Sequence, residues 1–131
     1  MTAERVGVIH GIGQIAIRVH DVDRAAAFYQ EKLGLPELFR APGMAFFDCD
    51  GTRLMLTLPS RADFDHPSSI LYFRVSGIHP AAEKLAKRGV DFEREPHKVA
   101  EMSDHDLWLA FFRDSEGNLM AISSSEPKQR S

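Results

Sequence analysis

The segment Gly13-Gln-Ile-Ala-Ile-Arg-Val19 is followed 56 residues later by a similar one, Ser69-Ile-Leu-Tyr-Phe-Arg-Val75. In the first copy Ile15, Ile17 and Val19 alternate with other residues, as in a strand with one face in the core. Each copy precedes a helical pattern, and each helical pattern precedes three short strand patterns. A set of elements that recurs in the same order indicates a chain built from two copies of one unit.

The helical patterns have clear beginnings and ends. Asp21 or Asp23 can cap the first helix, because either carboxylate can accept hydrogen bonds from the first turn. Gly34 ends this helix. The second helix is predicted over 78–88, opened by Pro80, with Gly89 as its terminator.

The strand patterns complete the unit βαβββ. The expected strands after the first helix span 37–40, 44–49 and 53–58, and those after the second helix begin at Val90, Leu107 and Leu119. We therefore expect an α+β fold of two tandem βαβββ modules within a single domain. Its parts are module one at about 12–58, a linker at 59–68, module two at about 69–124 and a short flexible C-terminal tail at 125–131.

Composition restricts the choice of partners and compartment. Sixteen Lys and Arg against nineteen Asp and Glu give a net charge of −3, which disfavours nucleic acid and anionic membrane surfaces. The one cysteine, Cys49, lies in an apolar run and is expected to be a buried free thiol. No apolar run reaches the length of a membrane span, so we expect a soluble, cytoplasmic protein.

Five short stretches carry a resemblance to a known family. They are Ile12–Val19, Asp21–Asp23, Ala27–Tyr29, Leu33–Leu35 and the run Phe112-Arg-Asp-Ser-Glu-Gly-Asn-Leu119. In these stretches the chain resembles the vicinal-oxygen-chelate superfamily, which includes glyoxalases, bleomycin-resistance proteins and extradiol dioxygenase-like domains. The resemblance implies a cup-shaped mixed sheet around a cavity, and a homodimer. In the catalytic members a divalent metal in the cup chelates two oxygens of the substrate.

The same resemblance implies four metal-ligand positions, which fall on Gln14, Met55, Ile70 and Ala121. The amide oxygen of Gln14 can bind a cation, but the thioether of Met55 is a poor ligand for such ions, and Ile70 and Ala121 have no donor. A stable site needs three or four protein ligands. We therefore expect no metal site of the usual kind and no cofactor; the alternative is an atypical site for Zn, Ni, Mn or Fe.

Two histidines are candidate catalytic residues. His97 and His105 flank a segment, 98–104, that is expected to be a loop over the cup. Imidazoles near a cavity can bind a metal or act as a general acid and base. The alternative is that both side chains only make hydrogen bonds within the loop.

The remaining candidate ligand-binding residues are aromatic. Tyr72 is expected on the cup face, whereas for Trp108 the alternating run Leu107–Phe112 does not show which face lines the cup. Apolar walls with a few polar groups suit a small organic ligand, although the same residues can simply pack in the core or a dimer interface. Arg18 and Arg74 occupy matching repeat positions and can anchor a carboxylate or lie on the surface. The predicted ligand-binding set is Gln14, Met55, Ile70, Tyr72, Trp108 and Ala121.

Three functions are consistent with these residues. The favoured one is binding of a small organic molecule in an apolar cup without a metal. The alternative is a metal-dependent lyase, epimerase or ring-cleaving dioxygenase with an atypical metal site. A third, metal-free acid–base catalysis by His97 or His105, lies between them.

Overall fold

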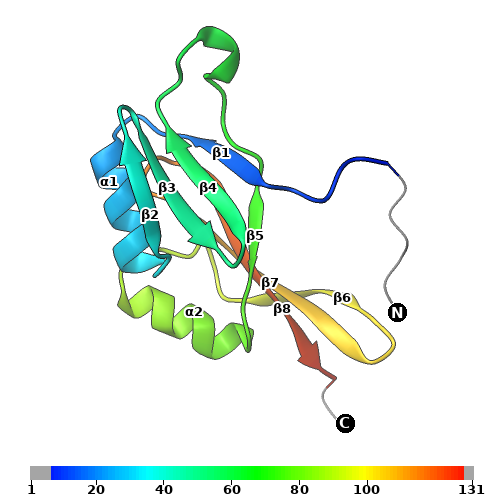
Figure 1. Cartoon of the computed structure of the whole chain (residues 1–131). Helices are drawn as coiled ribbons and strands as arrows, with labels where there is room; N and C mark the ends of the chain where they lie inside the picture. Colours follow the sequence, from blue (N-terminus) through cyan, green and yellow to red (C-terminus); the bar gives the residue numbers. More distant parts are fainter. Residues whose placement is uncertain (1–6, 129–131) are drawn as a thin grey trace.

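The computed structural model describes residues 7–128 and contains two four-stranded sheets, each with its own helix (Figure 1). The strands are β1 (Gln14–Arg18), β2 (Glu37–Ala41), β3 (Met44–Cys49), β4 (Thr52–Thr57), β5 (Leu71–Arg74), β6 (His97–Glu101), β7 (His105–Arg113) and β8 (Leu119–Pro127). The helices are α1 (Val22–Ala27), which continues as a π-helical turn (Phe28–Lys32), a 3₁₀ turn (Ala62–Phe64) and α2 (Ile78–Lys87).

The two sheets have the same topology. Their strand orders are β1-β4-β3-β2 and β5-β8-β7-β6, with the first pair of each parallel and the other pairs antiparallel. The registers correspond as well. Ala16 of β1 lies opposite Met55 of β4, and Tyr72, at the matching repeat position on β5, lies opposite Ala121 of β8. The α+β fold of two βαβββ modules is confirmed.

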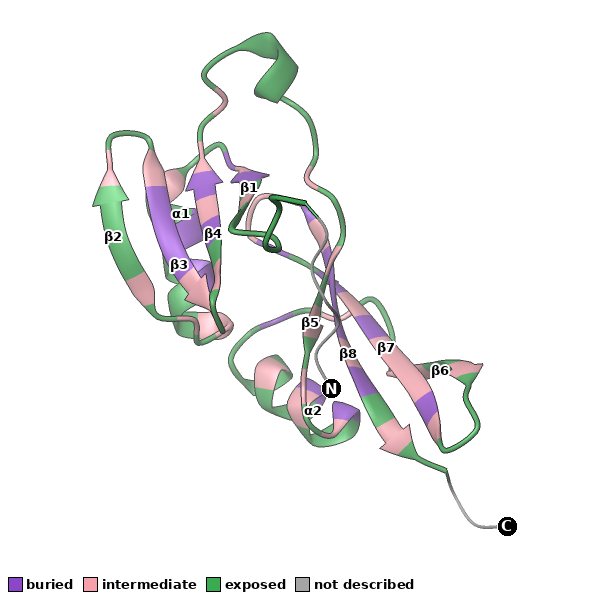
Figure 2. Cartoon of the chain, turned by 45° about the vertical axis from the view of Figure 1, so that its right-hand side comes forward, coloured by how far each residue is buried: buried purple, intermediate pink, exposed green. Residues whose placement is uncertain are grey.

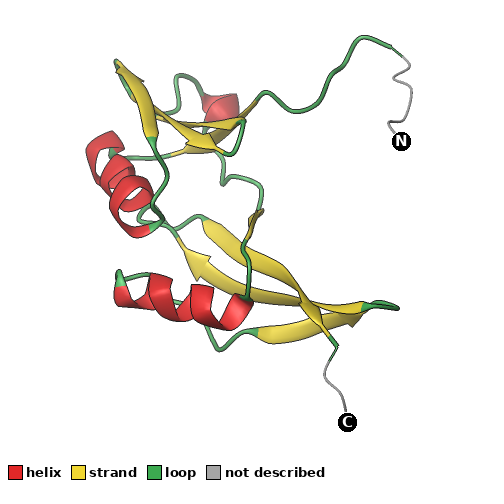
Figure 3. Ribbon diagram, turned by 60° about the horizontal axis from the view of Figure 1, so that its bottom comes forward, coloured by secondary structure: helices red, strands yellow, loops and turns green. Residues whose placement is uncertain are grey.

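Local signals explain where the helices begin and end. The Asp21 carboxylate accepts a hydrogen bond from the backbone N–H of Arg24 at 3.0 Å, so Asp21 is the cap, whereas Asp23 pairs with Arg40. Gly34 has φ of +77°, a left-handed conformation that favours glycine and ends the helical segment. Figure 3 shows both helices on the same side of the molecule.

One hydrophobic core joins the two modules. Helix α1 packs on β3 and β4, and α2 packs on β7 and β8. Phe112 of β7 lies at the centre, with its ring centroid 6.5 Å from that of Phe28, 6.5 Å from Phe73 and 5.7 Å from Phe92. The buried residues gather on the central strands, while the edge strands β2 and β5 contain only intermediate and exposed residues (Figure 2). The modules therefore share one core.

Two strands differ from expectation in the second module. The strand predicted from Val90 does not form; Phe92 makes only an isolated bridge to Phe112. Instead β6 occupies residues 97–101, where a loop was expected, and pairs with β7. Val90 is buried in the core without a strand partner, and Pro96, which has no N–H for a ladder, separates it from β6.

The last strand is also longer than expected. Residues 125–127, assigned to the C-terminal tail, continue β8 and pair with β7, where Ser125 lies opposite Leu107 and Pro127 opposite His105. Strand β7 is nine residues long and presents backbone N–H and C=O groups along its whole length. The longer β8 supplies hydrogen-bond partners for these groups. Residues 129–131 of the predicted tail lie outside the described residues. No helix in residues 7–128 is long and apolar enough to cross a bilayer.

Candidate functional site

Each sheet has one face turned away from its helix, which we call its open face. On β1 the core residues Ile15 and Ile17 alternate with Gln14, Ala16 and Arg18, which therefore lie on the open face. In the neighbouring strands the same alternation assigns further side chains to this face of the first sheet. They are Arg53, Met55 and Thr57 of β4 and Phe46 of β3.

Gln14 is engaged by its neighbours on the open face. The guanidinium Nε of Arg53 donates a hydrogen bond to the amide oxygen of Gln14 at 2.7 Å. The amide nitrogen of Gln14 lies 3.6 Å from the sulfur of Met55. Gln14 therefore supplies the only side-chain oxygen at the four family metal positions, and this oxygen already accepts from the Arg53 guanidinium. The positive charge of Arg53 would repel a divalent metal.

The other family metal positions do not supply what is missing. Ala121 is fully buried, Ile70 precedes β5 and is 40% exposed, and neither has a donor atom. Among residues 7–128 no three His, Cys, Asp or Glu side chains are close enough together to hold a metal ion. The donors present do not fit the superfamily's usual metal site.

The open face of the second sheet is aromatic. The ring centroids of Tyr72 and Phe111 lie 6.1 Å apart in an edge-to-face contact, and Ala121 lies opposite Tyr72 in the strand register. Tyr72 is 51% exposed. Three of the predicted ligand-binding residues, Tyr72, Ala121 and Ile70, are therefore on or beside the second sheet, while Gln14 and Met55 share the first.

Trp108 lies on the opposite face of the second sheet. Its ring centroid is 5.0 Å from that of His79 on α2, and it packs against the core. Since alternate residues of a strand face opposite ways, Leu107, Leu109 and Phe111 are the residues of β7 on the open face. The structure thus separates Trp108 from the other predicted ligand-binding residues.

The two candidate histidines are not brought together. His97 lies opposite Leu109 in the register, so it is four positions from His105 along the hairpin, or roughly 13 Å at the rise of a strand. The Nδ1 of His97 accepts from Arg94 at 3.3 Å, and the Nδ1 of His105 lies 2.7 Å from a carboxylate oxygen of Asp104. They cannot act as one acid–base pair within this chain.

A polar cluster that was not anticipated ties the turn after β7 to the first module; we call it the inter-module clasp. In it the carboxylate of Asp114 accepts a hydrogen bond from the hydroxyl of Tyr29 at 2.7 Å, where both residues are buried. It also accepts from the backbone N–H groups of Glu116 and Asn118, at 2.8 and 2.9 Å. Burial, together with the charge of Asp114, raises the pKa of Tyr29 well above its usual value.

Glu116 forms the other half of the clasp. Its side chain is buried, accepts from the backbone N–H groups of His20 and Asp21 at 2.8 and 3.1 Å, and pairs with Arg24 at 2.7 Å. Burial alone would raise the pKa of Glu116, but these hydrogen bonds and one from Ser115 hold it at about 2. The run Asp114–Asn118 belongs to one of the stretches that resemble the family. A single sequence, however, does not show which distant residues this run contacts.

Acidification is expected to destabilise the fold through Glu116. Because its pKa of about 2 in the folded chain is below the ordinary 4.5, its contribution is complete above pH 4.5 and is lost as the pH falls through 2. After allowance for solvent at the exposed Arg24, this amounts to about 2 kcal/mol. In urea unfolding from pH 6 to 2, Glu116→Gln should flatten the curve of stability against pH, whereas the partly exposed control Glu93→Gln should not. An unchanged slope in Glu116→Gln would contradict this reading.

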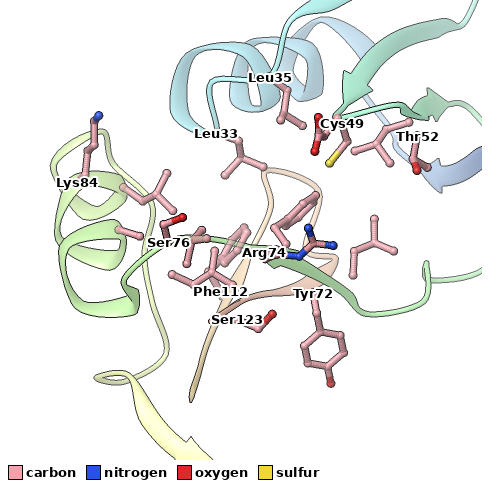
Figure 4. Close-up of a pocket in the computed structure, with 18 of the residues that line it drawn as sticks. Leu33, Leu35, Cys49, Thr52, Tyr72, Arg74, Ser76, Lys84, Phe112 and Ser123 are labelled. Carbon is pink, nitrogen blue, oxygen red and sulfur yellow. The ribbon is translucent and has the colours of Figure 1, made fainter. Parts of the chain in front are cut away.

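A cavity of about 740 Å³ lies between the two modules (Figure 4). Its walls come mainly from the core-facing side chains of both sheets and from the two helical segments, and Tyr72, Arg74 and Ser123 border it from the open-face side of the second sheet. Tyr72, at the edge strand β5, borders it but points away in the close-up, whereas the guanidinium of Arg74 points in. Its volume lies within the range typical of pockets that bind small molecules.

Comparison with known proteins agrees with the two-module architecture. The "Uncharacterized protein YurT" of Bacillus subtilis (strain 168) is 32% identical, over 82% of this chain and 93% of its own length. A solved member of the glyoxalase/bleomycin resistance protein/dioxygenase superfamily from Sphaerobacter thermophilus has a TM-score of 0.72 at 23% identity, covering 88% of this chain and 98% of that one. A lactoylglutathione lyase from Agrobacterium tumefaciens has a TM-score of 0.68 at 22% identity, covering 89% and 95%. These structures share the fold.

The family match covers nearly the same residues as the two modules. Residues 11–122 match the Glyoxalase/Bleomycin resistance protein/Dioxygenase superfamily, which confirms the resemblance inferred from the repeated motifs. The matched range runs from just before β1 into β8 and so includes every element that builds the open faces and the clasp. The chain therefore belongs to the Glyoxalase/Bleomycin resistance protein/Dioxygenase superfamily.

Proposed function

We propose that this protein binds a small organic molecule against its open faces, without the metal chemistry of the catalytic superfamily members. The observation that carries the proposal is the bond between Arg53 and Gln14, which occupies the only competent donor at the four family positions. The side chains of the two open faces, Phe46 and Met55 on the first sheet and Tyr72 and Phe111 on the second, favour an apolar or aromatic ligand. The protein would then sequester or sense its ligand.

We further propose that a second copy of the chain completes the site as a homodimer. In the described chain β1 and β5 each pair on one side only, which leaves an edge of each sheet free for pairing. Exposed aromatic residues, Phe39 at 48% and Tyr72 at 51%, would be covered in such an assembly. The lone thiol of Cys49 fits a reducing, cytoplasmic compartment.

The binding proposal is tested with a neutral fluorescent probe, N-phenyl-1-naphthylamine, and with metals. Probe binding should weaken about tenfold in Phe111→Ala, since a lost aromatic contact of about 1.4 kcal/mol corresponds to that factor. Phe64→Ala, an exposed phenylalanine on the 3₁₀ turn, is the matched control and should bind normally. Equal losses in both variants, or no binding to the parent protein, would overturn the proposal.

Calorimetric titration of metal-free protein with Zn, Ni, Mn and Fe(II) completes the test. We expect no stoichiometric binding, either in the parent chain or in Gln14→Ala. Stoichiometric binding that Gln14→Ala abolishes would overturn the metal-free proposal and favour the alternative, a metal-dependent lyase, epimerase or dioxygenase.

A further inference from the structure

We infer that the cavity between the modules is a second binding site, specific for an organic carboxylate with an apolar body. This site lies between the modules, mainly on the helix side of the two sheets, and it is proposed separately from the function of the open faces. Arg74 alternates with the core residues Leu71 and Phe73, so it reaches the cavity from the open-face side of the edge strand β5. The inference combines two observations, the apolar walls of the cavity and the state of its arginines.

The walls come from both modules. Leu33 and Leu35, which follow the first helical segment, face Leu71 and Phe73 of β5 and Leu85 of α2. All five are only partly buried and pack against the common core, so they present apolar surface to the cavity. A ligand chain lying there would remove that surface from water, which is favourable in proportion to the area covered.

The basic side chains of the cavity form no ion pair with a carboxylate of the described residues. Within residues 7–128, every arginine side chain has a hydrogen bond or ion pair except Arg74 and Arg88, and both line this cavity. Lys84 lines it as well and pairs with no described carboxylate. The one acidic residue of the lining is Asp50, so the lining carries a net positive charge.

The two arginines line the apolar cavity from different elements, Arg74 from β5 and Arg88 from the end of α2. The guanidinium of Arg74 points into the cavity, whereas the ammonium of Lys84 points outward at its rim (Figure 4). The Nη1 of Arg88 lies 3.0 Å from the position that a Cβ on Gly34 would occupy, so the missing side chain of Gly34 leaves room for it between Leu33 and Leu35. A planar guanidinium with free N–H groups can bind a carboxylate with two parallel hydrogen bonds.

Decanoate, decanol and the single cysteine provide the test. Cys49 lines the cavity and is the only cysteine of the chain, so its alkylation by N-ethylmaleimide reports on this site. Burial raises the pKa of Cys49, and the reaction is therefore followed at pH 8. Decanoate should bind by calorimetry and slow the alkylation of Cys49, and decanol, which lacks the charge, should bind at least tenfold more weakly.

Arginine variants separate the charge from the apolar contact. Arg74→Gln and Arg88→Gln should each weaken decanoate binding about tenfold while leaving the melting temperature unchanged, because neither side chain has a hydrogen-bond or ion-pair partner among residues 7–128 to lose. Arg61→Gln, an exposed arginine paired with Asp63, is the matched control and should bind decanoate normally. Equal affinity for decanol, equal loss in the control, or undiminished alkylation of Cys49 would each overturn the inference.

The outcome is distinguishable from failure of the open-face proposal. Phe111→Ala should leave decanoate binding unchanged, since Phe111 does not line the cavity. Likewise, decanoate should not displace N-phenyl-1-naphthylamine from the open face. Loss of decanoate binding in Phe111→Ala would place the carboxylate on the open face and overturn the second site.

Discussion

Phe112→Ala is expected to lower the free energy of unfolding by about 4 kcal/mol, which is the typical cost of emptying a buried phenylalanine site. The ring of Phe112 is fully buried and contacts Phe28 of the first module as well as Phe73 and Phe92 of the second. Its removal would enlarge the cavity where the two modules meet, which Phe112 lines. Urea unfolding followed by tryptophan fluorescence measures the loss.

The neighbouring residue provides a matched control. Phe111 lies on the open face of the same strand and is only partly buried. Phe111→Ala should therefore cost about 1 kcal/mol, since much of its ring is already in contact with water. Similar losses in Phe111→Ala and Phe112→Ala would contradict the assignment of the two faces of β7.

Asp114→Ala is expected to cost about 3 kcal/mol, because it leaves several buried donors without an acceptor. The hydroxyl of Tyr29 and the backbone N–H groups of Glu116 and Asn118 all donate to this carboxylate. Asp104→Ala, which removes an exposed carboxylate at the β6–β7 turn, should change stability by less than about 0.5 kcal/mol.

A double-mutant cycle shows whether the loss reflects the clasp. Tyr29→Phe alone should cost about 1 kcal/mol, because Asp114 keeps its backbone donors. In the Asp114→Ala background the same change should cost less, since the hydroxyl of Tyr29 no longer has its partner. Strictly additive losses would show that Tyr29 and Asp114 are not energetically coupled.

Much of the fold could be predicted from the repeated pattern alone. The similarity of the segments at Gly13 and Ser69 gave the order of the elements in both modules, and Gly34 and Gly89 gave the ends of the helices. These signals are local, since alternation and helix termination depend on residues that are neighbours in the chain. Strand β6 was misplaced, because Val90 and Phe92 are apolar residues that pack in or against the core and do not form a strand, and the end of β8 was set too early.

The site was less predictable, for reasons visible in particular residues. Every residue from Leu107 to Phe112 is apolar, so alternation could not show that Trp108 faces α2 and Phe111 the open face. The engagement of Gln14 by Arg53 depends on parallel pairing of β1 and β4, which places distant positions side by side. The unpaired state of Arg74 is likewise a property of the folded surroundings.

The inter-module clasp has a consequence for the order of events during synthesis. Its partners are 85 to 96 residues apart in the chain, since Tyr29 binds Asp114 and His20 binds Glu116 in the turn after β7. The first helix leaves the ribosome well before the turn that contains Asp114. Until that turn emerges, the hydroxyl of Tyr29 lacks its Asp114 partner. Contacts of such long range slow folding and prolong the exposure of apolar surface. We therefore expect the final folding step to follow emergence of the turn after β7 from the ribosome, with chaperone contacts concentrated on the first module.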